Sequence, residues 1–436
     1  MNDMMGRRAW GAPLALGFVW CWSCSVPVAT DTPAQATVAG TPTQPVARPQ
    51  PLPPLQPFVE KGLDWLCGAQ QADGGWGAGS HSRQDVRDAH AVPTDPATTA
   101  SAAMAFLRAG HGLDRGDYGT VVQKATEYLL RTVETAPDGP QITGLTGTQP
   151  QAKMGQNVDT ALAAQYFARL LQQTDLAADL RPRVTAALDV CLRKIESSQG
   201  QDGSWAAGGW APVLQSSNMC TALELAGLAG RAIDHEKLAR ARDYQRQQVT
   251  ATSGPVGGTV DYAPKADAAA GVSLYASAAN QRGVVAEAKV AEQLVEAGKR
   301  EGKLAADAAL TAEALQQLGV AEDRAAGMLQ SVQMNTAAKV RSFDENLLAG
   351  FGNNGGEEFL SYQMKSESLV IDGGEEWSKW TTLMHERLAK VQNQDGSWSG
   401  HHCITSPAFC TASAISCLTA DRDAEWLRKS AQVAAK

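Results

Sequence analysis

Residues 70–76 read Gln70-Gln71-Ala72-Asp73-Gly74-Gly75-Trp76, and the same Gln-x-x-Asp-Gly-x-Trp phrase returns at 199–205 and 392–398. Successive copies start 129 and 193 residues apart, so a unit of about 64 residues fits twice into the first gap and three times into the second. Fainter copies stand at Asp138-Gly139, Gly257-Gly258 and 351–356. Repetition at this period predicts about six stacked copies of one supersecondary unit.

Each unit is predicted to hold two helices. Residues 58–71 place Val59, Leu63 and Leu66 at helical spacing, and the Asp-Gly that follows ends the helix. Charged segments are predicted to be outer helices and nearly uncharged ones inner helices. The outer segments include 118–134 and 181–198, and the inner ones are 97–109, 157–172, 216–229 and 405–418. No long segment alternates as a strand does, so we expect an all-α fold: an α/α toroid, a closed ring of about six helical hairpins.

The stretch from Lys61 to Trp76 resembles the QW repeat of the prenyltransferase and squalene–oxidosqualene cyclase superfamily. This stretch has the residue types of that repeat at the same spacing: a basic residue, a small residue, an aromatic, an aliphatic, a Gln and a Gly-x-Trp. The two later copies match only from the Gln to the Trp. The resemblance covers roughly residues 56–436 and implies the toroid fold. It also implies that the Gln satisfies backbone groups at a helix end while the Trp stacks over the neighbouring turn.

The amino terminus predicts export. Arg7 and Arg8 precede an apolar run, 9–22, that is too short to span a bilayer, so residues 1–24 are expected to be a secretory signal peptide. We therefore expect a bacterial envelope or periplasmic location.

Two processing sites remain open. Cys24 follows a small residue, as in the lipobox of bacterial lipoproteins, although Trp22 departs from that pattern, and Ala34-Gln35-Ala36 offers an ordinary cleavage site. The lipid anchor at Cys24 is favoured, because the Pro-rich linker 25–55 would separate a membrane from the 56–436 domain.

Composition limits the partners. The net charge of −8 and the lack of a basic patch or nucleic-acid-binding motif argue against a nucleic-acid partner. Six cysteines follow the signal region, and free buried thiols are expected for most of them. Cys410 and Cys417 lie on one helix face about 10 Å apart, too far for a disulfide.

The acid signature of the family's cyclases is absent from the sequence. Squalene–hopene-type cyclases protonate their substrate with Asp-x-Asp-Asp, which does not occur here. Asp421-Arg422-Asp423 has only two of the acids and is expected to lie on a solvated face. Only 6% of residues are aromatic, which is few for a cavity that stabilises carbocations.

One metal-binding cluster is a candidate. His401-His402-Cys403 precedes a predicted inner helix, and imidazole and thiolate are good zinc donors. His402 and Cys403 would be the ligands, with a further one from Asp95 or Glu358. The alternative is a polar loop with incidental histidines.

Other candidate ligand-binding residues precede inner helices as well. Glu357 and Glu358 could bind a cation or share a proton, or they could only complement a helix dipole. The remaining candidates are Asn157, Asp159 and Asn218, near Gln149, Gln151, Lys153, Trp210 and Gln215. Loops entering inner helices should converge on the ring axis, so these residues together with His401 and His402 are the predicted site.

Two classes of function follow. The favoured one is a non-catalytic, membrane-tethered binding domain that holds an isoprenoid, lipid, other small molecule or envelope protein in or near its central cavity. The alternative is a divergent cyclase or transferase that acts on an isoprenoid or lipid.

Overall fold

The computed structural model describes residues 53–174, 176–206, 208–252, 261–265, 271–352 and 354–434. The predicted signal peptide, the sites at Cys24 and Ala36 and the repeat copy at Gly257-Gly258 lie outside these residues. Within the described part, none of the helices combines the length and the apolar character needed to cross a membrane.

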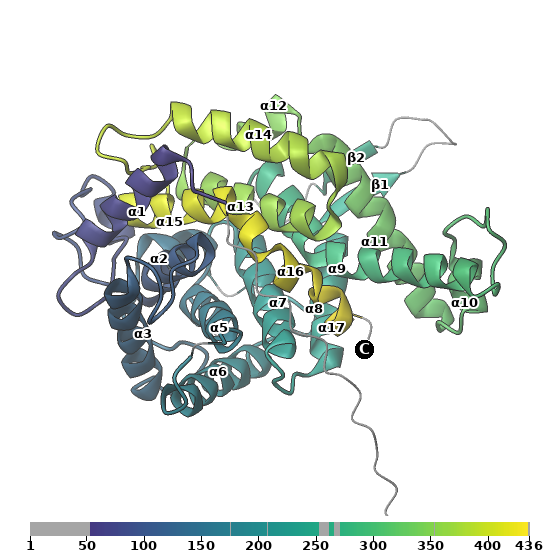
Figure 1. The fold of residues 1–436 in the computed structure, drawn as a ribbon, viewed down its shortest axis with the longest axis horizontal. Coiled ribbons are helices and arrows are strands. Elements are labelled where there is room, and N and C mark those ends of the chain that lie inside the picture. Colours follow the sequence, from purple (N-terminus) through teal and green to yellow (C-terminus); the bar gives the residue numbers. More distant parts are fainter. Residues whose placement is uncertain are drawn as a thin grey trace, which may run out of the picture. The chain divides into compact units, whose positions relative to one another are not determined.

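In the described part of the chain, six helices form the inner layer of a closed ring (Figure 1). Each packs against the next, and the last packs against the first, which closes the ring. Every residue of the first inner helix except Ser101 is buried, which explains its nearly uncharged sequence. The inner helices are α2 (Pro96–Ala109), α5 (Val158–Leu171), α7 (Pro212–Leu228), α9 (Ser273–Arg300), α13 (Gly356–Asp372) and α15 (Pro407–Leu418).

Six further helices of the described residues form the outer layer, and each packs against the inner helix that precedes it around the ring. They are α1 (Pro57–Ala69), α3 (Gly119–Glu134), α6 (Leu180–Ser197), α8 (His235–Gln247), α11 (Glu322–Arg341) and α14 (Gly374–Lys390). The predicted α/α toroid, its six hairpins and the inner and outer segments are confirmed. Helix α7 begins earlier than predicted because Pro212 occupies its first turn, a favourable place for proline.

The Trp of each repeat phrase caps the outer helix before it. Trp76 Nε1 donates to the carbonyl oxygen of Leu66, in the last turn of α1, at 2.8 Å. Carbonyls in a last turn have no partner inside the helix, and the buried indole supplies one while it fills the core. The other copies pair Trp205 with Ile195 and Trp398 with Leu388, both at 2.8 Å.

The Gln of each phrase joins its own turn to the next outer helix. Gln70 Nε2 donates to the carbonyl oxygens of Gly74 and Val121, both at 2.9 Å. The implied backbone role of the Gln is therefore confirmed, with the added finding that it links successive hairpins. The same pairs of bonds join Gln199 to Gly203 and Lys237, and Gln392 to Gly396 and Phe58. Because Phe58 lies in α1, the third copy ties the last hairpin to the first.

The Asp-Gly of the phrase requires its glycine. Gly74 has a φ of +93°, and a Cβ there would lie 2.4 Å from the carbonyl oxygen of Lys124 in the next outer helix. Only glycine permits both this backbone conformation and this approach. Gly203 and Gly396 repeat the arrangement against Arg240 and Lys61.

Other elements lie outside the six hairpins. Strands β1 (Val249–Thr252) and β2 (Asp261–Pro264) form a short antiparallel pair that the sequence analysis did not predict. Helix α10 (Ala312–Gln317) packs between extensions of α9 and α11 and forms an arm visible at the right of Figure 1. Shorter connecting elements are η1 (His81–Arg83), α4 (Gln149–Met154) and α12 (Glu345–Leu348).

The chain after α15 corrects one prediction. It forms η2 (Ala420–Asp423), α16 (Ala424–Arg428) and α17 (Ser430–Ala434), which pack against inner helices. Asp421 is exposed as predicted, but Asp423 is only 2% exposed. The expectation of a solvated face was wrong for Asp423, because η2 turns its carboxylate toward arginines near the ends of α2 and α5.

Candidate functional site

The segments that lead into the inner helices meet at one end of the ring, which we call the rim. The Thr405 backbone N–H, before α15, donates to Gln149 Oε1, before α5, at 2.7 Å. The Asn157 backbone N–H donates to Gln215 Oε1 of α7 at 2.8 Å. Side chains from separate hairpins are therefore interlocked at the rim.

Asp159 joins two inner helices. Its Oδ1 accepts the Ala97 N–H at 3.0 Å and its Oδ2 accepts Gln151 Nε2 at 2.7 Å. Burial, with a smaller contribution from the negative charge of Asp95, raises the pKa of Asp159 to about 7. Asp95 itself is the N-cap of α2 and accepts the N–H groups of Thr98 and Ala78. Both carboxyl groups are fully buried and already bonded within the fold.

The two candidate asparagines have different surroundings. Asn157 is the N-cap of α5 at the rim, and its buried Oδ1 has no partner among the described residues. Asn218 lies further along α7, where its Nδ2 donates to the Leu214 carbonyl and its Oδ1 accepts Gln165 Nε2. The structure therefore keeps Asn157 at the rim and places Asn218 in the contact between α5 and α7.

Glu358 is a structural residue of the rim. It is fully buried at the start of α13, and its carboxylate accepts the N–H groups of Phe351 and Gly355, each at 2.9 Å. It also accepts the Tyr275 hydroxyl at 2.6 Å. Burial, followed by the charge of Glu358, raises the pKa of that Tyr275 hydroxyl. Glu358 thus caps the start of α13 through the Gly355 N–H.

Glu357 retains an unused oxygen. Its Oε2 accepts the Ile404 N–H at 3.3 Å, whereas the buried Oε1 has no partner in the described structure. Burial, and then the negative charge of Glu358, raises the pKa of Glu357 to about 7. The side chain is therefore partly protonated near neutral pH and can donate or accept a hydrogen bond.

The His401-His402-Cys403 loop lies beside the start of α13, and the His401 N–H donates to the Asn354 carbonyl oxygen at 2.8 Å. His401 is exposed, and the His402 ring packs edge-to-face on Phe351 with centroids 5.2 Å apart. Cys403 has a φ of +61°, and burial, followed by the charge of Glu357, raises the pKa of its thiol.

Among the described residues, no group of three or more His, Cys, Asp or Glu side chains is arranged to hold a metal ion. The structure gives His402 and Cys403 no third ligand from Asp95 or Glu358, whose oxygens are bonded elsewhere. The six cysteines after the signal region are free, as expected, and all except Cys67 are buried.

An exposed aromatic cluster at the rim was not recognised from the sequence. Trp210, before α7, is 42% exposed, and Phe351, before α13, is 55% exposed. Their ring centroids are 5.7 Å apart in an edge-to-face contact. Lys153 Nζ lies 5.6 Å from the Trp210 centroid, and Tyr275 of α9 contacts Trp210 from the side. The available signal was an aromatic residue next to glycines directly before two predicted inner helices.

We call Trp210, Phe351, Lys153, His402 and Glu357 the rim cluster. Both ring nitrogens of His402 are buried and without partners in the described structure, as is Glu357 Oε1. Burying a polar group without a hydrogen bond costs free energy, so these atoms are available to a ligand or to water.

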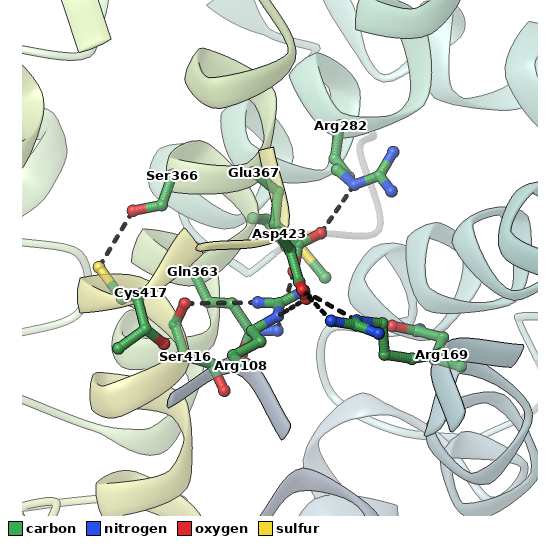
Figure 2. A network of polar contacts seen from close by, with 12 residues as sticks. Arg108, Arg169, Arg282, Gln363, Ser366, Glu367, Ser416, Cys417 and Asp423 are labelled. Carbon is green, nitrogen blue, oxygen red and sulfur yellow. Dashed lines mark hydrogen bonds and ion pairs between the residues drawn. The ribbon is translucent and has the colours of Figure 1, made fainter. Parts of the chain in front are cut away.

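The interior of the ring holds ion pairs at the carboxyl-terminal part of the inner helices (Figure 2). Arg108 of α2 donates to Glu367 of α13 at 2.5 Å and to Asp423 of η2 at 3.2 Å. Arg169 of α5 reaches the other oxygen of Asp423 at 2.6 Å. Glu367 also accepts Arg282 of α9 at 2.9 Å.

The chain of charges continues to the outer layer. Arg282 pairs with Glu224 of α7 at 3.0 Å, and Glu224 accepts Arg242 of α8 at 2.8 Å. Burial alone would raise the pKa of Glu367, but the charges of Arg108 and Arg282 outweigh it and lower that pKa to about 2. Glu367 therefore remains ionised at neutral pH, and we call these seven residues the charge chain.

One small cavity lies beside these ion pairs in the described structure. Helices α2, α5, α13 and α15 line it, and its volume of about 10 Å³ is enough for a single water molecule. Sites for small organic ligands usually measure about 300–1,000 Å³.

Comparison with known proteins gives two related findings. The squalene–hopene cyclase C-terminal domain family matches residues 50–154, which include the first hairpin. A squalene–hopene cyclase of Bradyrhizobium diazoefficiens is 36% identical over 77 residues, which is 17% of this chain and 11% of that protein. The matched part thus spans about a tenth of the length of this relative.

Proposed function

The chain belongs to the squalene cyclase and prenyltransferase repeat superfamily, and from this premise we propose that it is an exported, non-catalytic binding domain. Its ligand is proposed to be a small apolar molecule, such as an isoprenoid or a lipid, held at the rim rather than inside the ring.

The ring interior favours this location. A polyprenoid cyclised inside the ring would need a wide apolar cavity, whereas the inner helices here enclose arginines and carboxylates around about 10 Å³. Removing either member of a buried ion pair to make room would leave a charge without a partner, at a cost of about 3–5 kcal/mol.

The exposed aromatic pair carries the proposal. Trp210 and Phe351 are two of the three large hydrophobic side chains that are exposed in the described structure; the third, Val340, lies on α11. Two adjacent exposed aromatic rings offer apolar contact area that water solvates poorly. The unpaired atoms of His402 and Glu357 next to them can bind a polar head group.

Calorimetric titration of the full chain with farnesol tests the proposal. We expect saturable binding that the Trp210→Ala and Phe351→Ala variants each weaken at least tenfold. Val340→Ala is the matched control, because it removes an exposed apolar side chain of α11 that is not part of the rim cluster. Equal affinities of the three variants and the wild type, or no binding at all, would contradict a rim site for isoprenoids.

One observation favours a second candidate, a divergent cyclase or transferase. Glu357 is buried, has a free oxygen and has a pKa of about 7, so it could deliver a proton to a ligand at the rim. Incubation with squalene or farnesyl diphosphate, followed by mass spectrometry, tests this candidate. A product formed by the wild type and not by Glu357→Gln would replace the binding proposal with catalysis.

Localisation is a separate part of the proposal. The charged start, the short apolar run and the Pro-rich linker support export and tethering through a lipid on Cys24. Fractionation of cells that express the wild type and Cys24→Ser tests it: the wild type should be found with membranes and the variant in the soluble envelope fraction. A wild type that is soluble and begins at Thr37 would show ordinary cleavage after Ala36 instead.

A further inference from the structure

A second cavity, remote from the rim, opens where the charge chain reaches the outer layer. It has a volume of about 340 Å³ and lies between α8, α9, α11 and α17. Its wall is apolar at Leu238, Ala239 and Val433, and its charged lining residues are His235, Arg242, Asp243, Arg246, Glu287, Asp323 and Arg324. We call it the Arg242 pocket.

Arg242 forms the buried end of the charge chain in this pocket. The residue is 5% exposed and donates both Nε and Nη2 to Glu224 Oε1, at 3.3 and 2.8 Å. In the described structure its bonds leave Nη1 unused. A guanidinium group in a cavity wall with one free amino group is suited to receive an acidic oxygen.

The charge chain carries an excess of positive charge. Its described members are four guanidinium groups (Arg108, Arg169, Arg242 and Arg282) and three carboxylates (Glu224, Glu367 and Asp423). Adding the neighbouring buried pair of Arg246 and Glu287 leaves the excess unchanged. An uncompensated buried charge is costly, so a counter-ion at an accessible end of the chain would stabilise the protein.

The acids that line the pocket do not supply this counter-ion. Glu287 is committed to Arg246 and to the Ser331 hydroxyl, which donates to it at 2.6 Å. Asp243 bonds Arg246 but its side chain is 53% exposed, and Asp323 at the mouth is exposed as well, so water screens both charges. At the mouth, exposed Arg324 adds a positive group and donates to the Ala434 carbonyl at 2.9 Å.

We propose that the Arg242 pocket binds a small anionic ligand through a carboxylate or phosphate group. The acidic group lies between Arg242 Nη1 and Arg324, and the rest of the ligand packs on Leu238, Ala239 and Val433. A bound anion neutralises the excess positive charge of the charge chain. Because the charge chain includes Asp423, binding stabilises both the ring and the carboxyl-terminal segment.

Inorganic phosphate and citrate are the test probes, titrated into the full chain at constant ionic strength set with sodium chloride. Both calorimetry and thermal unfolding should report one saturable site per chain, with a rise in Tm that chloride alone does not produce. Saturation with either probe supports the proposal and identifies which acidic group is preferred. Absence of saturable binding by both probes overturns it.

Two variants assign binding to this pocket without disturbing the buried ion pairs. Arg324→Gln removes the guanidinium at the mouth and should weaken binding about tenfold. Ala239→Asp introduces a negative charge at the exposed wall and should abolish it. Arg183→Gln, on the exposed face of α6, is the control with the same charge change as Arg324→Gln and should bind as the wild type does. Equal affinity of all three variants would show that the anion binds elsewhere.

Discussion

At the scale of single residues, the Gln of the repeat phrase is suited to its place because its side-chain nitrogen bonds two backbone carbonyl oxygens at the same time. Gln392 Nε2 donates to the Gly396 and Phe58 carbonyls, both at 2.7 Å, while the backbone of its own turn is fixed by Asp395. A primary amide has two N–H donors on one nitrogen, so a single Gln can satisfy two carbonyls from different hairpins.

Gln392→Ala should therefore destabilise the ring. Both carbonyls lose their side-chain partner in a half-buried position, for which we expect a loss of about 1–3 kcal/mol in the free energy of unfolding. Urea denaturation measures it. Gln394→Ala, in the same turn but exposed, is the control and should change little. Equal stability of the two variants would contradict a closing role for Gln392.

Lys365 is a buried cation without an acid partner in the described structure. Its Nζ donates to Ser277, Gln281 and Ser342 at 3.1–3.2 Å. Burial lowers the pKa of Lys365 to about 7. In the unfolded chain a lysine titrates near 10.4, so between about pH 7 and pH 10 the unfolded state binds more protons than the folded one.

The free energy of unfolding of the wild type should consequently rise with pH over this window relative to Lys365→Met, which has no titrating group there. Below about pH 7 the penalty of protonating the buried amine is fully present and the difference should be constant. Chemical denaturation at several pH values measures the difference between the two proteins. Lys379→Met, at an exposed position, is the control and should show the wild-type pH dependence throughout. If the free energy of unfolding of Lys365→Met changed with pH as that of the wild type does, the buried lysine would not titrate in this range.

At the scale of elements, the short carboxyl-terminal segment holds two inner helices together. Asp423 in η2 accepts Arg108 of α2 and Arg169 of α5, and Arg428 of α16 donates to the Val370 carbonyl of α13 at 3.0 Å. The Arg169 guanidinium also lies 5.3 Å from the Trp426 ring centroid. These contacts join the neighbouring helices α2 and α5 to α13, which is not adjacent to either of them in the ring.

Asp423→Asn should cost about 3–5 kcal/mol, because the buried Arg108 and the partly buried Arg169 lose their shared counter-ion while the side chain keeps its size. Thermal and urea unfolding measure the effect. Asp421→Asn, two residues earlier and exposed, makes the same chemical change on the surface and should be nearly neutral. A loss of similar size in both variants would mean that the ion pairs contribute no more than a surface charge does.

The helices could be predicted from the sequence, and the environment of individual charges could not. Inner helices such as α2 carry little charge because neighbours surround them, and this is visible in local composition. The burial of Asp423 depends on Arg108, which lies far away in the chain, so no local pattern reveals it. The rim was predicted because toroid hairpins place their loops at one end, but the exposure of Trp210 and Phe351 follows only from packing in three dimensions.

At the scale of the whole molecule, the described structure contains two hydrophobic cores of unequal size. The larger runs around the ring and includes residues from α1 to α17. The smaller gathers the extended halves of α9 and α11 with α10 and α17, around Leu315, Val295 and Met328. A separate small core in an extension should open without the ring, because few of its contacts are shared.

Hydrogen exchange on the native protein can measure this independence. Leu315→Ala removes a fully buried side chain from the smaller core, so amides of α10 and the adjoining ends of α9 and α11 should exchange faster while those of α2, α5 and α15 stay protected. Leu223→Ala, equally buried in α7, is the matched control in the ring and should lower the protection of all inner helices together, since closure makes them one cooperative unit. If Leu315→Ala accelerated exchange throughout the ring to the same extent, the arm and the ring would unfold as a single body, and the arm would have no stability of its own.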